Sequence, residues 1–269
     1  MELKDLRGLV ATVVTTGTVM EEFSQCLCNM RAWCVTEGFV NIEWQQFSAT
    51  LVEAGRDAVV AHAKENSYDF VLMVDADAVF KDTMLFEMLE TAFVAAPESD
   101  AVSAYAQLKH PPYLPVIDTG TGTWEPHFPG EGILKCMRVG GHCILIKPSA
   151  WNRFGPPWFR TRNTLKPMDA LREVDNYARI NNHGENPLAD AAWLSLMNKA
   201  TEEFGGSTAT VGEDSGFCDT LSAYGGSIFV NTNIITGHVT KRTIFAKDLR
   251  DSLQEKKAKL ALSVGVLLS

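Results

Sequence analysis

Strand-like and helix-like segments alternate through the first hundred residues, and this alternation limits the folds that the chain can adopt. Runs of β-branched and apolar residues predict strands at residues 8–14, 39–47, 70–74 and 101–108. Apolar residues at helical spacing predict helices at 20–37, 51–64 and 82–93. Strands joined by helices through short connections form a mostly parallel sheet with helices on both faces. The sequence therefore predicts an α/β fold, a Rossmann-like single domain with a mostly parallel central sheet flanked by helices.

Composition places the chain among ordinary globular proteins. Of its 269 residues, 46% are hydrophobic and 21% are charged, and the mean hydropathy is -0.03. The sequence does not open on an apolar signal core, and no apolar run approaches the roughly 20 residues of a membrane span. We therefore expect a cytoplasmic protein without a membrane span. The net charge of -9 argues against general binding to nucleic acid or anionic membranes.

Two carboxylates follow the third predicted strand, one residue apart. The apolar run at 70–74 ends in Asp75-Ala76-Asp77. In an open α/β sheet the ligand crevice lies beyond the carboxyl ends of the strands, where hard cations bind carboxylates together with substrate phosphates. Aspartate is also common in a solvated turn after a strand. The motif alone fits a divalent metal site and a turn equally well.

The middle of the chain is irregular. Residues 118–132 are rich in glycine and threonine and predict a loop or an edge hairpin. Gly140 and Gly141 precede an apolar strand at 143–146, and glycines there allow a ligand or another backbone to approach closely. The aromatic segment 151–159 predicts a packed corner of the core, because large aromatic side chains are mostly buried.

Two further motifs carry titratable groups. Glu213 and Asp214 open a predicted helix that runs to about residue 224. Acids at a helix start cap free N–H groups, typically worth ~1 kcal/mol, but a rigidly held Asp214 would also suit a general base. A last strand at 227–235 leads to His238, which fits either a structural hydrogen bond or a metal ligand.

The order of these motifs resembles that of the GT-A glycosyltransferases, especially compact single-domain enzymes of the family 2 type from bacteria and phages. The resemblance covers residues 8–245 and rests on Arg56-Asp57, Val74-Asp75-Ala76-Asp77, Gly140-Gly141, Gly212-Glu213-Asp214-Ser215-Gly216-Phe217-Cys218 and Gly237-His238. It departs from the family pattern at Thr15-Thr16, where a proline is usual, and at Asp57, where an asparagine is usual. If a phage encodes the chain, the location would be the host cytoplasm.

The resemblance implies a GT-A catalytic domain at 1–245 that moves a sugar from a nucleotide diphosphate sugar, UDP-sugar foremost, to a hydroxyl acceptor. Asp77 and His238 would hold Mn²⁺, or Mg²⁺, and a mixed oxygen and imidazole site suits Mn²⁺ better. The catalytic pair would be Glu213 and Asp214, with Asp214 as the base, which favours inversion. The donor would contact Thr15, Thr16, Gly17, Arg56, Asp75, Gly140 and Gly141.

Two segments lie outside this motif set. Residues 160–206 are polar and rich in asparagine, and we expect an acceptor-side insertion or lid there. Residues 246–269 carry a leucine and valine stripe opposite lysines, which predicts an amphipathic helix. We expect that helix to pack on the domain or on a second subunit of a homo-oligomer, with binding to a membrane surface as the alternative.

The acceptor hydroxyl would belong to a glycan, a protein or modified DNA. An acid-free stretch carries aromatic residues and seven cations, namely Lys135, Arg138, Lys147, Arg153, Arg160, Arg162 and Lys166. These cations would suit the phosphates of hydroxymethylated DNA, whose target base must leave the stack, or the donor diphosphate, or a solvated surface. A different class also stays open: a catalytically inactive nucleotide-sugar binding protein, or a nucleotidyltransferase on a similar scaffold.

Overall fold

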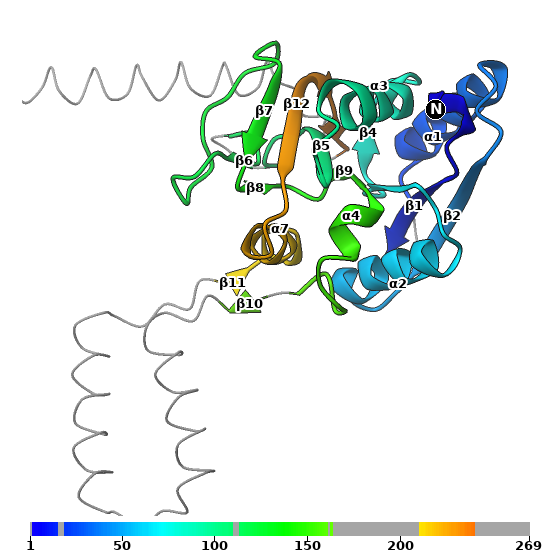
Figure 1. Cartoon of the computed structure of the whole chain (residues 1–269). Coiled ribbons are helices and arrows are strands. Elements are labelled where there is room, and N and C mark those ends of the chain that lie inside the picture. Colours follow the sequence, from blue (N-terminus) through cyan, green and yellow to red (C-terminus); the bar gives the residue numbers. More distant parts are fainter. Residues whose placement is uncertain (1, 16–18, 110–112, 161, 164–209, 240–269) are drawn as a thin grey trace, which may run out of the picture. The chain divides into compact units, whose positions relative to one another are not determined.

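A computed structural model gives the structure of residues 2–15, 19–109, 113–160, 162–163 and 210–239 (Figure 1). The chain divides into a larger unit, Met1–Arg160 with Glu213–Ser269, and a smaller unit, Thr161–Gly212. Of the smaller unit, the structure describes one antiparallel pair, β10 (Arg162–Asn163) and β11 (Thr210–Val211). Most of the predicted insertion at 160–206 and all of the predicted helix at 246–269 lie outside the described residues.

The larger unit is built on a seven-stranded sheet in the order β2-β1-β3-β9-β5-β12-β7. The strands are β1 (Gly8–Val14), β2 (Ile42–Ser48), β3 (Phe70–Val74), β5 (Ala101–Tyr105), β7 (Ile133–Cys136), β9 (Cys143–Ile146) and β12 (Ile228–Ile235). Strands β1, β2, β3, β5 and β12 run in one direction, whereas β7 and β9 run in the other. The predicted α/β fold with a mostly parallel sheet is confirmed.

Helices cover both faces of this sheet (Figure 1). On one face lie α1 (Glu21–Thr36) and α3 (Met84–Glu90), which continues into the π-helical turn η2 (Thr91–Ala95). On the other face lie α2 (Val52–Glu65), α4 (Pro148–Trp151) and α7 (Glu213–Ala223), and a short 3-10 helix, η1 (Leu3–Asp5), precedes β1. Each face has its own apolar core, because strands buried on both sides present side chains to both layers. In the described part of the chain, no helix has the length and apolar character needed to cross a membrane.

Strand β9 enters the sheet antiparallel, between β3 and β5. A parallel strand needs a crossover connection, usually a helix, and the described residues between β5 and β9 form only loops and short strands. Among these are β6 (Ile117–Asp118) and β8 (Arg138–Val139), which pair with each other, and the edge strand β7. Because Cys143 pairs with Val74, the residue before β9 lies at the carboxyl end of β3, and the Asp75 N–H donates to the His142 carbonyl at 2.9 Å.

A second ladder brings the end of β12 to the same place. The two-residue strands β4 (Ala78–Val79) and β13 (Gly237–His238) pair antiparallel, with His238 opposite Ala78. The Val239 N–H also donates to the Asp77 carbonyl at 2.7 Å. Two segments more than 150 residues apart are thus fixed side by side through backbone bonds.

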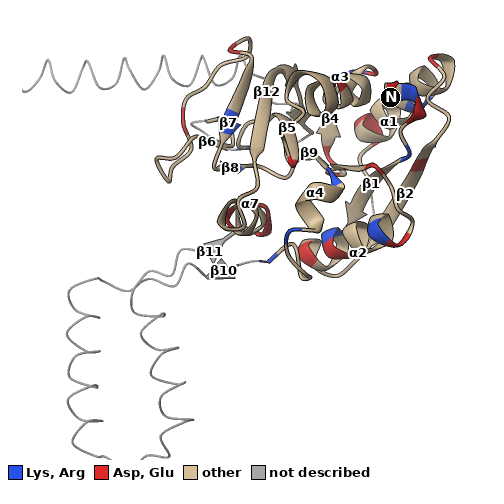
Figure 2. Ribbon diagram, in the orientation of Figure 1, with Lys and Arg blue, Asp and Glu red and all other residues tan. Residues whose placement is uncertain are grey.

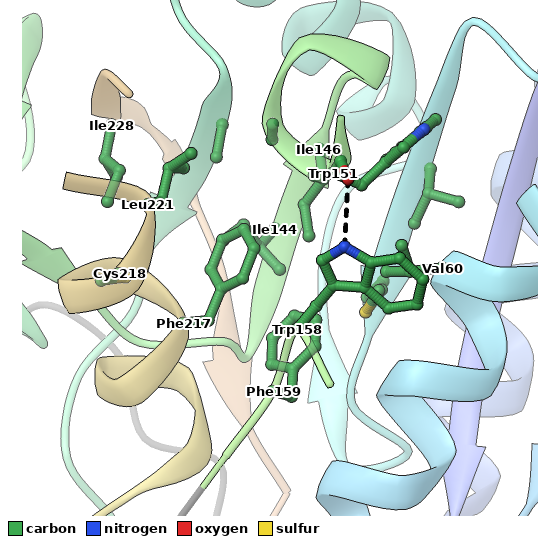
Figure 3. Close-up of a cluster of buried hydrophobic side chains, with 14 of the residues drawn as sticks. Val60, Ile144, Ile146, Trp151, Trp158, Phe159, Phe217, Cys218, Leu221 and Ile228 are labelled. Carbon is green, nitrogen blue, oxygen red and sulfur yellow. Dashed lines mark hydrogen bonds between the residues drawn. The ribbon is translucent and has the colours of Figure 1, made fainter. Parts of the chain in front are cut away.

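The aromatic segment after α4 is a packed corner of the core, as the sequence predicts (Figure 3). The Trp158 indole N–H donates to the Trp151 carbonyl at 3.1 Å, and the Phe159 ring stacks on Phe217 with centroids 4.7 Å apart. One oxygen of Asp57, on α2, accepts the backbone N–H groups of both Trp158 and Phe159 at 2.8 Å. Asp57 therefore ties this corner to α2.

Replacing Asp57 tests this connection. In Asp57→Ala, two largely buried N–H groups lose their acceptor, and we expect the free energy of unfolding to fall by about 2 kcal/mol. Asp57→Asn is the matched control, because it keeps the acceptor oxygen and removes a charge that burial disfavours, as the raised pKa of Asp57 indicates. Urea unfolding followed by circular dichroism measures both variants. Equal stability of Asp57→Ala and the wild type would contradict this role.

Candidate functional site

A cleft of about 360 Å³ opens at the carboxyl ends of β1 and β3. This size is typical of small-molecule sites, and the location is where open α/β sheets bind ligands. One part of its wall is apolar and consists of Val13, Met20 and Val52. Another part is charged and consists of Arg56, Asp75, Asp77, Lys109 and Glu213.

Three potential metal ligands meet at the charged wall. Asp77, His142 and His238 each offer one ligand atom, and these atoms lie within 4.8 Å of one another. Nδ1 of His238 is 3.7 Å from Oδ1 of Asp77, and Nδ1 of His142 is 4.0 Å from the same oxygen. The two imidazole rings are buried, with centroids 3.7 Å apart. The β3–β9 and β4–β13 ladders described above put the two histidines there.

The hydrogen bonding of His142 leaves its other ring nitrogen facing the two aspartates. Its Nε2 lies 3.1 Å from the Gly237 carbonyl, and because a carbonyl can only accept, Nε2 carries the hydrogen. In the neutral ring, Nδ1 then presents a lone pair toward Asp77 and toward Oδ2 of Asp75, 3.6 Å away. Nδ1 of His142 and Nδ1 of His238 are buried without a hydrogen-bond partner among the described residues. A metal ion between these atoms and Asp77 would satisfy both, so the residues fit a metal site.

The protonation states of the cluster also favour metal binding. Burial lowers the pKa of His238, which keeps its ring in the neutral form that binds metals. Burial alone would raise the pKa of Asp77, but the neighbouring His238 ring and the Lys109 ammonium together outweigh it, and the pKa is lowered. A donor set of one carboxylate and two imidazoles suits Mn²⁺ or another transition ion better than Mg²⁺.

Beside the cluster, Arg56 holds two of the acids in place. The Arg56 side chain is only 4% exposed. Its guanidinium donates to Asp75 at 2.9 Å, to Glu213 at 3.1 Å and to the Gly141 carbonyl at 3.1 Å. Burial would lower the pKa of Arg56, but the neighbouring acids raise it. A Cβ atom at position 141 would collide with the guanidinium, so glycine is required there for the close approach of a side chain. The Phe159 ring lies 5.6 Å from the guanidinium carbon.

The two acids at the start of α7 have different surroundings. Glu213 lines the cleft, and burial raises its pKa, an effect that Arg56 only partly offsets. Asp214 instead accepts the Gly141 N–H at 3.0 Å and the Ser215 N–H at 2.7 Å, one on each oxygen. Of the pair, Glu213 is the carboxylate that faces the cleft.

The structure brings most of the predicted site residues together. Thr15, Arg56 and Asp75 line the cleft, whereas Gly140 and Gly141 are buried and do not. Thr16 and Gly17 lie outside the described residues. His142 was not predicted as a ligand from the sequence. Its signal is its position between the Gly140-Gly141 pair and an apolar strand, where close approach of a ligand was expected.

Three of the seven cations of the basic stretch have partners within the fold, and Lys166 lies outside the described residues. Arg138 pairs with Asp219 at 2.6 Å, and Arg153 pairs with Asp100 at 3.0 Å. The Lys147 ammonium is inside the protein, bonded to the carbonyls of Ala92 at 3.0 Å and Pro97 at 2.8 Å. In Figure 2, the Lys and Arg positions are scattered among Asp and Glu positions rather than gathered on one element. Acids distant in the sequence thus neutralise Arg138 and Arg153, and backbone carbonyls bind the Lys147 ammonium.

Comparison with known proteins shows likeness at the level of the fold. No protein-family model and no curated protein matches the chain. The structure of A197 from STIV is similar over 90% of this chain and 92% of its own length, with a TM-score of 0.54 and 14% identity. That similarity shows a shared fold alone.

Two glycosyltransferase structures are similar over shorter stretches. One is involved in the glycosylation of the major capsid of PBCV-1, with a TM-score of 0.34 and 10% identity, covering 56% of this chain and 68% of that one. The other is the mannosyltransferase PcManGT from Pyrobaculum calidifontis in complex with GDP-Man and Mn²⁺, with a TM-score of 0.34 and 13% identity, covering 62% of this chain and 51% of that one. These TM-scores are too low to carry an inference about function.

Removal of the Arg56 charge tests the network. In Arg56→Met, Asp75 and Glu213 lose the cation between them, and we expect the free energy of unfolding to fall by about 3–5 kcal/mol, the usual cost of breaking a buried ion pair. Arg31→Met, at an exposed position of α1, is the matched control and should change stability by less than about 0.5 kcal/mol. Denaturant unfolding of both variants decides the matter, and equal effects would show that the network adds nothing.

Proposed function

We propose that the protein is a metal-dependent, inverting glycosyltransferase that moves a sugar from a nucleotide diphosphate sugar to a hydroxyl acceptor. The observation that carries this proposal is the cluster of Asp77, His142 and His238 at a cleft whose wall is part apolar and part charged. A cation site beside an apolar surface is what a phosphate-bearing nucleoside requires.

The two parts of the wall fit the two parts of such a donor. The apolar residues Val13, Met20 and Val52 offer a surface for the nucleoside. The diphosphate would lie at the charged part, where Asp75, Asp77 and Glu213 would repel it without an added cation. Asp77, His142 and His238 would hold Mn²⁺, which when bound would neutralise the charge that develops on the leaving group.

Glu213 is proposed as the general base. In the transfer step, the acceptor oxygen forms a bond to the anomeric carbon while the bond from that carbon to the phosphate oxygen breaks. The acceptor proton passes to the Glu213 carboxylate, and the nucleoside diphosphate leaves. Burial raises the pKa of Glu213, which makes it a stronger base than an exposed glutamate. Asp214, the base predicted from the sequence, is proposed to position Gly141 against Arg56 through its two backbone bonds.

One experiment tests the function as a whole. The purified protein is incubated with Mn²⁺ and a panel of UDP-, GDP-, ADP- and CMP-linked sugars, and nucleotide release is measured with glycan, peptide and hydroxymethylated DNA acceptors. We expect acceptor-stimulated release from one donor, with UDP as the nucleotide predicted from the sequence. Binding without release would indicate a nucleotide-sugar binding protein, and pyrophosphate release from a nucleoside triphosphate with a sugar phosphate would indicate a nucleotidyltransferase.

Loss of one imidazole tests the metal site. In His142→Ala, the cluster keeps only two ligands, and we expect Mn²⁺ affinity to fall by at least about tenfold. His62→Ala, which removes a partly exposed imidazole from α2, is the matched control and should leave Mn²⁺ affinity unchanged. Isothermal titration measures both, and the wild type should bind Mn²⁺ more tightly than Mg²⁺. Equal Mn²⁺ binding by His142→Ala and the wild type would remove His142 from the site.

Paired amide variants separate the two acids of α7. Glu213→Gln keeps an oxygen for Arg56 but cannot take a proton, so donor affinity should persist while transfer falls by about 10²-fold or more. Asp214→Asn places an amide NH₂ against a backbone N–H donor, so it should lose about 1–3 kcal/mol of stability instead. Unfolding curves and transfer rates are measured on both. An active Glu213→Gln with a stable but inactive Asp214→Asn would place the base on Asp214.

A further inference from the structure

Lys109 is the exposed cation of the cleft. It follows β5, its side chain is 42% exposed, and its ammonium contacts Oδ2 of Asp77. The residue before it, Leu108, donates its backbone N–H to the Leu114 carbonyl at 2.9 Å. Through its contact with Asp77, the ammonium lies at the edge of the Asp77, His142 and His238 cluster.

The two oxygens of Asp77 have different neighbours. Oδ1 faces Nδ1 of His142 and Nδ1 of His238, whereas Oδ2 contacts Lys109. Lys109 neutralises the Asp77 carboxylate in this structure. A metal ion held by the three ligands would neutralise the same carboxylate. The ammonium and the metal ion would therefore compete for Asp77, because two cations close together repel each other.

Lys109 is also the cation of the cleft that is available to a ligand. Among the described lining residues, Arg56 is the other cation, and it is buried and bonded to Asp75, Glu213 and Gly141. A flexible, hydrated lysine beside a carboxylate can turn to a new anion at small cost, because an exposed ion pair contributes little.

We propose that Lys109 exchanges partners, pairing with Asp77 in the metal-free protein and with the phosphates of the nucleoside diphosphate once the metal ion is bound. This proposal rests on the proposed function. Breaking the bond to the sugar adds negative charge to the leaving diphosphate, and an ammonium released from Asp77 is placed to stabilise it. Lys109 is then a donor-binding residue whose availability depends on the metal.

The exchange predicts two effects of opposite sign in Lys109→Met. Mn²⁺ alone should bind up to about fivefold more tightly, because it no longer displaces the ammonium from Asp77. UDP or GDP, titrated at saturating Mn²⁺, should bind about tenfold more weakly, because a charged hydrogen bond to phosphate is lost. Lys109→Arg should retain nucleotide binding. Lys135→Met removes an exposed lysine from the edge strand β7 and should change neither affinity.

The outcomes separate this proposal from the proposed function. Weaker Mn²⁺ binding by Lys109→Met, with unchanged nucleotide binding, would show a structural ion pair and overturn the exchange. Equal nucleotide affinity of the wild type and Lys109→Met would overturn the phosphate role of Lys109 alone. Binding of neither UDP nor GDP by the wild type with Mn²⁺ would overturn the proposed function and this proposal with it.

Discussion

The candidate site depends on two backbone ladders that meet at the Asp75-Ala76-Asp77 segment. Pairing of β9 with β3 sets His142 beside Asp75, and pairing of β13 with β4 sets His238 beside Asp77. Backbone hydrogen bonds fix register, so the two ladders hold the backbone of both histidines beside this segment. A buried nitrogen lone pair that faces a carboxylate is unfavourable, and a cation between the imidazoles and Asp77 would remove this cost.

Arg56 lies against one oxygen of Asp75, and His142 lies against the other. The buried guanidinium balances Asp75 and Glu213, and Gly141 provides the space it needs. Without this fixed charge, the acids of the cleft would repel one another or take up protons. The buried guanidinium is thus a fixed positive charge in the wall of the cleft, and it offsets part of the negative charge of Asp75, Asp77 and Glu213.

The fold was predictable from the sequence where local pattern decides it, and the site only in part. Alternating strand and helix segments predicted the parallel sheet, and the buried run before Asp75 placed the acids at a strand end. The antiparallel entry of β9 depends on pairing with residues about 70 positions earlier, so nothing local predicted His142 as a neighbour of Asp77. For the same reason, the sequence showed Arg138 as a free cation, although Asp219 neutralises it from 81 residues away.

The single residue that separates Asp75 from Asp77 gives the two acids different tasks. Asp75 receives Arg56, which holds its pKa below the ordinary value even though burial alone would raise it. Its charge is thereby already balanced within the protein. Among the described residues, Asp77 has no guanidinium partner of this kind. Its neighbours are the imidazoles of His142 and His238 and the ammonium of Lys109. In the part of the chain that the structure describes, Asp75 is thus the acid paired with a buried guanidinium, and Asp77 is the acid that lies beside the two histidines and the lysine.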